Sequence, residues 1–435
     1  HILISDSVFT DVEGILDLTA TSYLTIRNSQ CHVNTAGTVF FSATPVSNIT
    51  ILGCEVTGGN TLVSFESGSG NIEIRDSTVA SLKKGISLRD GNGLAIHNSV
   101  FENIGTGSVL LLSNFAEVNI TGTTFAECNG DPVFDFATVW NLTMTDITFD
   151  ACPNDILDAT SVNNTLVRDC EFRGAAVGIN AMQSHHWTVL SNEFTDVGFC
   201  IGFYMASDLN ISYNTDHGQG SESIYLDTLA SPILVAHNTL TGTSSTAITV
   251  SSCTRSAVVE YNIIYQCQQG IVVSNTDNAV IRYNSVMDID QSGILLDYAA
   301  ATTVLNNTIG NTEYGFSVSH SGGSTFANNT LTNCGFIAAA PESLSDYSFT
   351  MENNTVNSKP LLYISSVNGV GVDGTQYGQI IVFNSTNIEI AGGSWSKLGN
   401  GLTITHSSFV DVHDVTLTDM YRAVLIVSAT TVTVS

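Results

Sequence analysis

The acidic residues with the most informative spacing lie in two short segments of similar composition. Cys128-Asn-Gly-Asp131 and Cys152-Pro-Asn-Asp155 place their Asp residues 24 positions apart. Two carboxylates held close together repel each other unless a proton or a cation intervenes. Oxygen ligands favour Ca²⁺, so Asp131 and Asp155 are candidates for a calcium site. The alternative is that both are exposed turn residues whose carboxylates point into water.

A second set of candidates surrounds Asp216, which occupies a repeat position that is otherwise mostly apolar. His217, Glu222 and Asp227 follow it. Paired carboxylates carry out glycoside hydrolysis, so Asp216 and His217 are weak candidates for a catalytic groove. A local bulge of the strand is the alternative. The segment Asn214-Thr-Asp-His-Gly218 resembles part of the polygalacturonase pattern. The further Asp pair and the basic element of that pattern are missing, and the Arg residues form no cluster.

The nine cysteines form no CxxC motif, so neither a zinc knuckle nor a redox motif is predicted. Cys128, Cys152, Cys267 and Cys334 share a repeat phase with apolar residues such as Ile104 and are expected in the core. Cys128 and Cys152 would lie on adjacent coils within disulfide distance. In-register parallel strands, however, aim both Cβ atoms the same way, which strains the bond. A disulfide and two buried thiols both remain open.

An internal repeat must position all of these residues. An anchor position recurs every 22–25 residues, with one gap of 39, and each period holds three short strands such as Ile72–Arg75, Val79–Leu82 and Gly85–Leu88. This pattern predicts an all-β fold, a right-handed parallel β-helix of about 18 coils. The anchor positions are Phe9, Cys31, Val56, Val79, Phe101, Phe125, Phe149, Phe172, Phe194, Asp216, Leu240, Ile264, Val286, Ile309, Leu331, Val356, Trp395 and Leu417.

Residues that tolerate a left-handed backbone precede each anchor and predict one sharp bend per coil. Up to Phe172 they stand three positions before the anchor: Asp6, Asn28, Gly53, Asp76, Asn98, Gly122, Asp146 and Asp169. From Phe194 on they stand two positions before it: Asn192, Asn214, Asn238, Asn262, Asn284, Asn307, Asn329 and Asn354. The shift near residue 191 predicts a shorter bend and a changed cross-section. The Asn side chains are expected to hydrogen-bond along the column; a ligand-binding stripe is the alternative.

The segments Gly270-Ile-Val-Val273, Ile281-Arg-Tyr-Asn284, Tyr314-Gly-Phe-Ser-Val318 and Asn328-Asn-Thr-Leu331 resemble the NosD-like β-helix repeats of the carbohydrate-binding and sugar-hydrolase group. Two further segments, Asn357–Tyr363 and Gly378–Ile388, resemble a part of prokaryotic, especially archaeal, surface members. The resemblance implies a secreted, often surface-attached protein and no single activity. NosD proteins are associated with copper-site maturation, but no Met, His and Cys cluster supports copper here.

The composition excludes several classes of protein. The chain has 435 residues, 12 Lys and Arg against 40 Asp and Glu, and a formal net charge of −28. So few cations cannot neutralise a phosphate track, which argues against nucleic-acid binding, and no window of about 18 apolar residues predicts a membrane span. Nine glycosylation sequons are present, about as many as chance predicts: Asn48, Asn119, Asn141, Asn163, Asn210, Asn306, Asn328, Asn353 and Asn384.

The expected domain organisation is β-helix coils over residues 1–356, an insertion or loop over 357–380, and final coils over 381–435. The chain begins and ends within the repeat, and uncapped coils invite pairing. We therefore expect an extracellular surface protein, such as an S-layer, sheath, filament or adhesin component, that assembles with itself or with other surface proteins. A protein that binds or processes carbohydrate is the alternative, and an enzyme is the less favoured interpretation. No cofactor is predicted except Ca²⁺.

Overall fold

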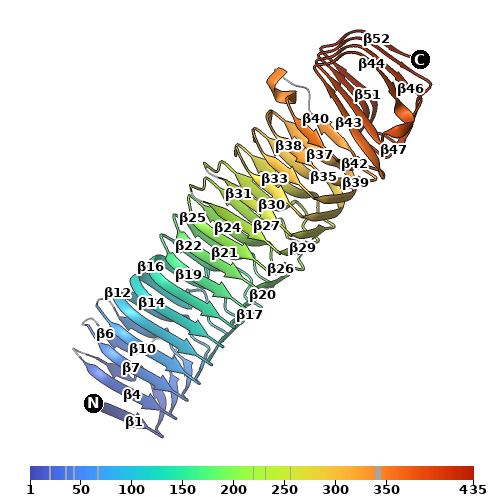
Figure 1. Ribbon diagram of the computed structural model, residues 1–435. Coiled ribbons are helices and arrows are strands. Elements are labelled where there is room, and N and C mark those ends of the chain that lie inside the picture. The colour runs from blue at the N-terminus through green and yellow to red at the C-terminus, as the bar shows by residue number, and fades with distance from the viewer. Residues whose placement is uncertain are drawn as a thin grey trace. The chain divides into compact units, whose positions relative to one another are not determined.

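The computed structural model describes residues 1–18, 21–34, 37–42, 45–65, 68–218, 220–230, 232–254, 256–338 and 344–435. These residues form a parallel β-solenoid of about 18 turns (Figure 1), and no α-helix occurs among them. The predicted parallel β-helix is therefore confirmed. The chain divides into two compact units, His1–Ile224 and Tyr225–Ser435, and each is described by itself.

In the first unit three ladders of parallel strands run through successive coils. The long strands β12, β14 and β16 pass through a bend and belong to the third and the first ladder in turn. The first ladder contains β1 (Ile2–Ser5), β4 (Ser22–Arg27), β7 (Ser47–Leu52), β10 (Gly70–Arg75), β12 (Lys84–His97), β14 (Leu110–Thr121), β16 (Phe134–Thr145), β19 (Asn163–Arg168), β22 (His185–Leu190) and β25 (Ser207–Ser212). The second contains β2 (Val8–Val12), β5 (Gln30–Val33), β8 (Glu55–Gly58), β11 (Thr78–Ala80), β13 (Val100–Glu102), β15 (Thr124–Ala126), β17 (Thr148–Asp150), β20 (Glu171–Arg173), β23 (Glu193–Thr195) and β26 (Thr215–Asp216). The third contains β3 (Leu16–Asp17), β6 (Thr38–Ser42), β9 (Thr61–Phe65), β18 (Asp155–Thr160), β21 (Val177–Met182) and β24 (Phe199–Tyr204), and β27 (Glu222–Asp227) spans the division between the units.

The second unit repeats the three ladders and then changes its coil length. The first ladder contains β28 (Ile233–Ala236), β31 (Ala257–Glu260), β34 (Val280–Arg282), β36 (Thr303–Leu305), β38 (Thr325–Ala327) and β41 (Thr350–Glu352). The other two contain β29 (Thr239–Thr241), β30 (Thr246–Ser251), β32 (Ile263–Tyr265), β33 (Gln269–Ser274), β35 (Ser285–Asp297), β37 (Thr308–Ser319), β39 (Thr330–Thr332), β40 (Phe336–Ala338) and β42 (Thr355–Val356). The remaining elements are the 3₁₀ helices η1 (Leu344–Tyr347) and η2 (Gly374–Gln376), β43 (Lys359–Ser365), β44 (Asn368–Asp373), β45 (Gln379–Phe383), β46 (Thr386–Ala391), β47 (Ser394–Ser396), β48 (Asn400–Thr405), β49 (Ser408–His413), β50 (Thr416–Thr418), β51 (Arg422–Val427) and β52 (Thr430–Val434).

The segment 357–380, expected as an insertion between coils, carries strands β43 and β44. Leu361 pairs with Gln379 and Asn368 pairs with Thr386, both in parallel and both at an offset of 18 residues. The helix η2 follows β44 at the place where other coils have their next strand. The residues between β42 and β45 therefore build a shortened coil with its own strand pairs.

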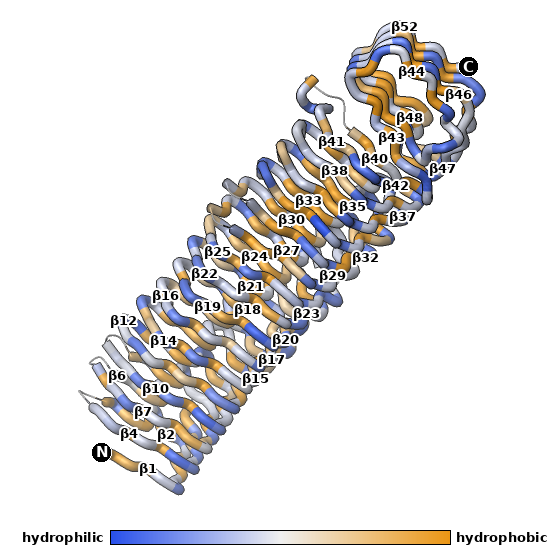
Figure 2. Tube along the Cα trace, viewed as in Figure 1, coloured by the Kyte–Doolittle hydropathy of each residue, from blue (hydrophilic) through white to orange (hydrophobic). Residues whose placement is uncertain are grey.

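The core is built from columns of equivalent side chains, one per coil. Every anchor position from Cys31 to Trp395 is buried, and apolar and polar residues alternate along the strands (Figure 2). Phe101, Phe125, Phe149, Phe172 and Phe194 stack with ring centroids 4.8–5.3 Å apart. All nine cysteines are buried free thiols, which confirms the core assignment of the four cysteines that share a repeat phase.

The bends follow one rule throughout, which corrects part of the prediction. The eight predicted bend residues from Asp6 to Asp169 all have positive φ, as expected. In the later coils, however, the left-handed residue is the one before each Asn, for example Tyr261 (φ 55°) before Asn262 and Tyr283 (φ 57°) before Asn284. The bend stays three positions before the anchor, so the predicted shortening of the bend near residue 191 is wrong.

The Asn residues of these coils point inward instead and form a buried hydrogen-bonded ladder. The Oδ1 atom of Asn284 accepts from the backbone N–H and the side-chain Nδ2 of Asn262, each at 3.0 Å. Its own Nδ2 donates to the Val259 carbonyl at 2.9 Å. Asn284 in turn donates its N–H to Asn307. In the early coils a hydroxyl has this task, since the Ser99 Oγ accepts the Ser77 N–H at 3.3 Å. The predicted Asn ladder is confirmed, one residue away from the bend.

We expect replacement of one ladder residue to lower the free energy of unfolding, by an amount that depends on the hydrogen-bond acceptor that remains. Asn284→Leu leaves the buried Asn262 N–H without its acceptor, at about 1–3 kcal/mol, and removes the Nδ2 donor from the Val259 carbonyl. Asn284→Ser keeps a hydroxyl acceptor of the kind used by the early coils and should lose about half as much. Urea denaturation followed by circular dichroism measures both. Equal midpoints for the two variants would contradict the ladder's role.

Candidate functional site

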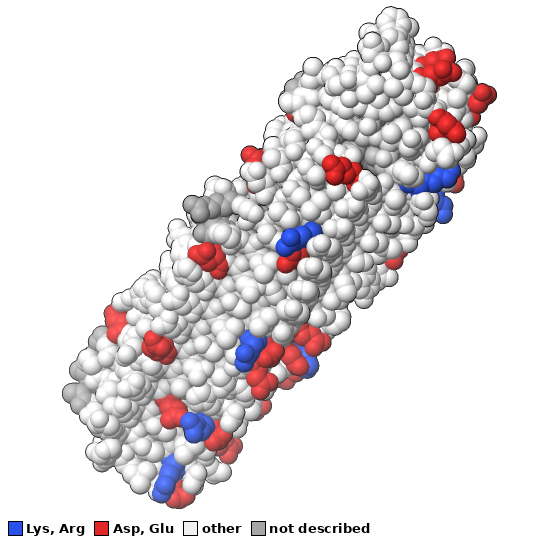
Figure 3. All heavy atoms as spheres, viewed as in Figure 1, with Lys and Arg blue, Asp and Glu red and all other residues white. Residues whose placement is uncertain are grey.

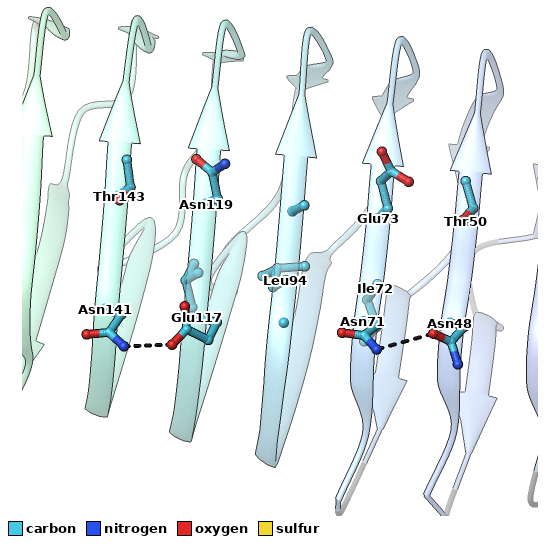
Figure 4. Close-up of a pocket in the computed structure, with 13 residues that line it drawn as sticks. Asn48, Thr50, Asn71, Ile72, Glu73, Leu94, Glu117, Asn119, Asn141 and Thr143 are labelled. Atoms are coloured by element: carbon cyan, nitrogen blue, oxygen red, sulfur yellow. Dashed lines mark hydrogen bonds between the residues drawn. The ribbon is translucent and has the colours of Figure 1, made fainter.

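A hollow of about 570 Å³ lies on the outer face of the first ladder in the first unit. It crosses five neighbouring strands, β7, β10, β12, β14 and β16, and two rows of side chains border it (Figure 4). We call this hollow the notch; it is lined by Asn48, Thr50, Asn71, Ile72, Glu73, Gly93, Leu94, Ala95, Glu117, Val118, Asn119, Asn141 and Thr143.

Two small residues on one coil open the notch. One row stands in register as Thr50, Glu73, Ala95, Asn119 and Thr143. Ala95 is the only member without a polar side chain, and its methyl group leaves a gap between Glu73 and Asn119. The neighbouring strands retain their long side chains on both sides of this gap (Figure 4).

The second row consists of left-handed bend residues, and it is interrupted at the same coil. Asn48, Asn71, Glu117 and Asn141 have φ between 53° and 57°, and Gly93 has a φ of 76°. Asn71 Nδ2 donates to Asn48 Oδ1 at 3.2 Å, and Asn141 Nδ2 donates to Glu117 at 2.7 Å. Gly93 has no side chain to continue this ladder, so a break separates Asn71 from Glu117.

The groups at the break are mainly hydrogen-bond acceptors. A Cβ atom placed on Gly93 would lie 2.8 Å from Asn71 Oδ1, so this oxygen borders the space that a side chain would occupy. The Glu117 carboxylate lies on the other side of the break. Glu73 lines the notch as well and forms an ion pair with Arg75 at 2.5 Å. A ligand that fills the break must therefore supply donors.

Of the sequence candidates, Asp131 lines a second, smaller hollow, and Asp155 is close enough for its charge to interact with that of Asp131. This hollow of about 380 Å³ is lined by Asp131, Asp135, Lys84 and several hydroxyl side chains. Burial raises the pKa of Asp155, and the charges of Asp131 and Asp158 add to the effect. The pKa of Asp135 is raised by burial and by Asp158, its partner in register on the next coil. We call Asp131, Asp135, Asp155 and Asp158 the acidic cluster; sequence reasoning had named only two of them.

The structure separates Asp216 from the surface and leaves His217 on it. Asp216 is 2% exposed and pairs in register with Phe194 at the end of the phenyl stack. Its carboxylate accepts from the Gly218 N–H at 2.7 Å and from the Ser223 hydroxyl at 2.5 Å. The His217 ring is half-exposed and lies 3.9 Å from Glu193. Asp216 is therefore a buried residue that stays in register with Phe194 on the preceding coil.

Burial determines the ionisation of Asp216 and of the neighbouring thiol. Burial raises the pKa of Asp216, while Ser223, Gly218, Cys200 and His217 partly offset the rise. Burial and the Asp216 carboxyl together raise the pKa of Cys200. Burial likewise raises the pKa of Cys31 to about 11 and that of Cys170 to about 12. These thiols stay protonated at neutral pH and offer no thiolate ligand or nucleophile.

One of the three tryptophans is exposed beside the notch, since Trp140 is 39% exposed and directly precedes the notch residue Asn141 on β16. Trp187 and Trp395 are buried. The exposed rings of His237, Tyr261 and Tyr283 stack on one another with centroids 4.8–4.9 Å apart, so they cover each other's faces. This aromatic column was not predicted, because the left-handed bends were assigned to the Asn residues beside it.

Two family profiles match the chain. The profile described as periplasmic copper-binding protein (NosD) matches residues 201–363, and that described as right handed beta helix region matches residues 135–260. The chain is a NosD-like right-handed β-helix repeat protein. This confirms both the family resemblance and the predicted handedness. A comparison with curated proteins finds no match.

Several solved structures are similar to this NosD-like chain at low identity. The periplasmic alginate epimerase AlgG is 11% identical over 88% of this chain and 77% of its own, with a TM-score of 0.33. An α-1,3-glucanase catalytic unit from Streptomyces thermodiastaticus is 13% identical over 82% and 64%, with a TM-score of 0.33. The Dettilon tailspike protein is 10% identical over 77% and 64%, with a TM-score of 0.30.

Neither a metal cluster nor a membrane-crossing helix is found in the described part of the chain. Within those ranges no group of three or more His, Cys, Asp or Glu side chains is placed to hold a metal ion. None of the described helices is both long enough and apolar enough to cross a membrane. The four residues of the acidic cluster are thus not placed as one group that could hold a metal ion within a single chain.

We expect Asp216→Asn to stabilise the protein at neutral pH. A carboxyl with a raised folded-state pKa adds stability below its ordinary pKa of about 4 and loses it as the pH rises through the raised value. The wild type should therefore lose thermal stability between about pH 4 and pH 7. The Asn variant should lose less and melt about 1–3 °C higher at pH 7. Differential scanning calorimetry at several pH values measures this; Asp196→Asn, at an exposed bend, is the control and should follow the wild type.

Proposed function

We propose that this protein binds carbohydrate outside the cytoplasm and that the notch is its binding site. The observation that carries the proposal is the break at Gly93 and Ala95, which opens a polar hollow in otherwise continuous rows of side chains. Amide, carboxylate and hydroxyl groups in planar rows suit a polyhydroxylated ligand, since each group can accept or donate to a sugar hydroxyl.

The dimensions of the notch favour an extended polymer. Its lining extends from β7 to β16, which spans four strand spacings, or about 19 Å at about 4.8 Å each. The rows run across the strands, so polar groups repeat at this spacing along the notch. A linear glycan presents hydroxyl groups along its whole length and can use several of these groups at once.

The same surface suits an added peptide strand poorly. In this region the backbone N–H and C=O groups of β10, β12 and β14 pair with the neighbouring coils. Peptide recognition by strand addition needs an open sheet edge, which these central strands do not present. The notch therefore suits a glycan better than an extended peptide.

The matched family supports the location outside the cytoplasm. The NosD profile describes a periplasmic protein, and the acidic chain carries few cations. Most of the face shown in Figure 3 carries no charged side chain. The copper binding named in the same description is not part of the proposal, because the described residues lack a metal cluster.

We expect Ala95→Asn and Ala95→Leu to abolish or strongly weaken glycan binding. Both side chains fill the gap between Glu73 and Asn119, and Asn matches the polar character of that row. Isothermal titration against a panel of soluble linear oligosaccharides measures the effect, which should be at least about tenfold in affinity. A reducing-sugar assay on the same panel shows whether a bound glycan is also cleaved.

The matched control is Ala126→Asn, at a position between Glu102 and Asp150 on the second ladder and outside the notch. It should bind as the wild type does. The sequon residues Asn48, Asn119 and Asn141 line the notch, so the protein should be produced in a host that adds no N-linked glycan. Unchanged affinity in both Ala95 variants would remove the notch as the site.

A second candidate function is assembly at a cell surface, and the acidic cluster is the observation that favours it. Asp135 and Asp158 stand in register on adjacent coils, and burial raises the pKa of both. A cation between two copies of the chain would neutralise these charges, and the second copy would supply the oxygens that one chain lacks. This proposal keeps Ca²⁺ at Asp131 and Asp155 and makes it a link between copies in an S-layer, sheath, filament or adhesin.

We expect millimolar Ca²⁺ to raise the melting temperature by about 2 °C and to produce larger species, because binding to the folded state alone stabilises it. Calorimetry and light scattering measure these two effects. The double variant Asp131→Asn/Asp155→Asn should lose both. Monodisperse monomers at high protein concentration, with or without Ca²⁺, would argue against assembly through this cluster.

A further inference from the structure

We infer that the notch selects glycans that carry ammonium groups, that is, amino sugars without N-acetyl groups. This inference rests on the proposed glycan-binding function and deepens it by naming the class of ligand. It follows from the hydrogen-bonding polarity of the break, from the charges that line it and from the position of the nearest cation.

The polarity of the break follows from the direction of the side-chain ladder. On each side of Gly93 the residue farther along the chain donates its Nδ2 to the residue before it, as Asn71 does to Asn48 and Asn141 does to Glu117. Gly93 removes the donor that Asn71 Oδ1 would receive. On the far side Glu117 presents a carboxylate, which can only accept. A ligand with strong donors satisfies both sides at once.

The charges of the lining have one sign. Glu73 and Glu117 are the charged residues among those that line the notch. Arg75 is bound to Glu73, with the two side chains 49% and 33% exposed. For Glu117, the hydrogen bond found in the described part of the chain is that from the neutral Asn141 amide. Among the residues that the structure describes, the Glu117 carboxylate thus has no cationic partner beside the gap.

The net charge of the whole chain also favours a cationic ligand. A net charge of −28 attracts cationic ligands and repels anionic ones over a range limited by the salt concentration. A polyuronate would bring like charge to Glu73 and Glu117. A neutral sugar would meet acceptors with hydroxyl donors only. An ammonium group supplies three donors and a compensating charge at one atom.

The experiment compares oligosaccharides of one length that differ in charge. Fully deacetylated chito-oligosaccharide, its fully N-acetylated form and oligogalacturonate are titrated into the intact chain at mildly acidic pH by calorimetry. We expect the deacetylated oligomer to bind about tenfold tighter than the acetylated one and the galacturonate to bind weakest. Only the affinity of the cationic oligomer should fall with added salt.

Charge-removing variants locate the effect. Glu117→Gln should weaken binding of the deacetylated oligomer by about three- to tenfold and binding of the acetylated one by a clearly smaller factor. Glu102→Gln, on an exposed position of β13 outside the notch, should change neither. Oligolysine of similar charge serves as a probe of charge alone and should bind more weakly than the amino sugar.

The outcomes separate this inference from the function on which it rests. Equal binding of the acetylated and deacetylated forms overturns the selection of ammonium groups and leaves glycan binding intact. Oligolysine that binds as tightly, with the same loss in Glu117→Gln, overturns the sugar identity. Failure of every oligosaccharide to bind overturns the proposed function itself.

Discussion

Parallel hydrogen bonding between coils at a constant register is the constraint on which the rest of the structure depends. Most strands pair with their equivalents 22–25 residues away, and those of the shortened coil pair at 18, so each side chain stands above its counterpart. Identical groups must therefore tolerate a spacing of about 4.8 Å. Phenyl rings do so by stacking, as Phe149 and Phe172 show at 5.1 Å. Amides do so by donating and accepting in one direction, as Asn262 and Asn284 show.

The same constraint explains why irregular residues carry the functional interest. A coil whose outward residues match its neighbours presents a continuous polar row with its groups already hydrogen-bonded to one another. Gly93 and Ala95 interrupt two such rows on one coil without disturbing the core, because both face outward while Leu94 between them is buried. The repeat builds the rigid framework of strands, and the short residues Gly93 and Ala95 leave an unfilled space on its outer face.

The stacking of coils also arranges the charged side chains, with different results at the acidic cluster and at the notch. Stacking places carboxylates of the acidic cluster close together, and their raised pKa values reflect burial and mutual repulsion. At the notch the carboxylates of Glu73 and Glu117 stand on opposite sides of one coil and face a gap. The first arrangement favours a shared cation, and the second favours a donor-rich ligand between the walls.

The sequence by itself determined the fold, since three short strands recur in a period of 22–25 residues with one anchor position, and it identified the core cysteines and the bends from Asp6 to Asp169. Only the tertiary structure decided which residue bends in the later coils. Local preference favours Asn284 for a left-handed backbone, yet Tyr283 adopts it, because the Asn284 amide must face inward to satisfy the Asn262 N–H. The notch was missed for a similar reason. Gly93 and Ala95 are unremarkable along the chain, and their meaning depends on the neighbours that packing places on either side.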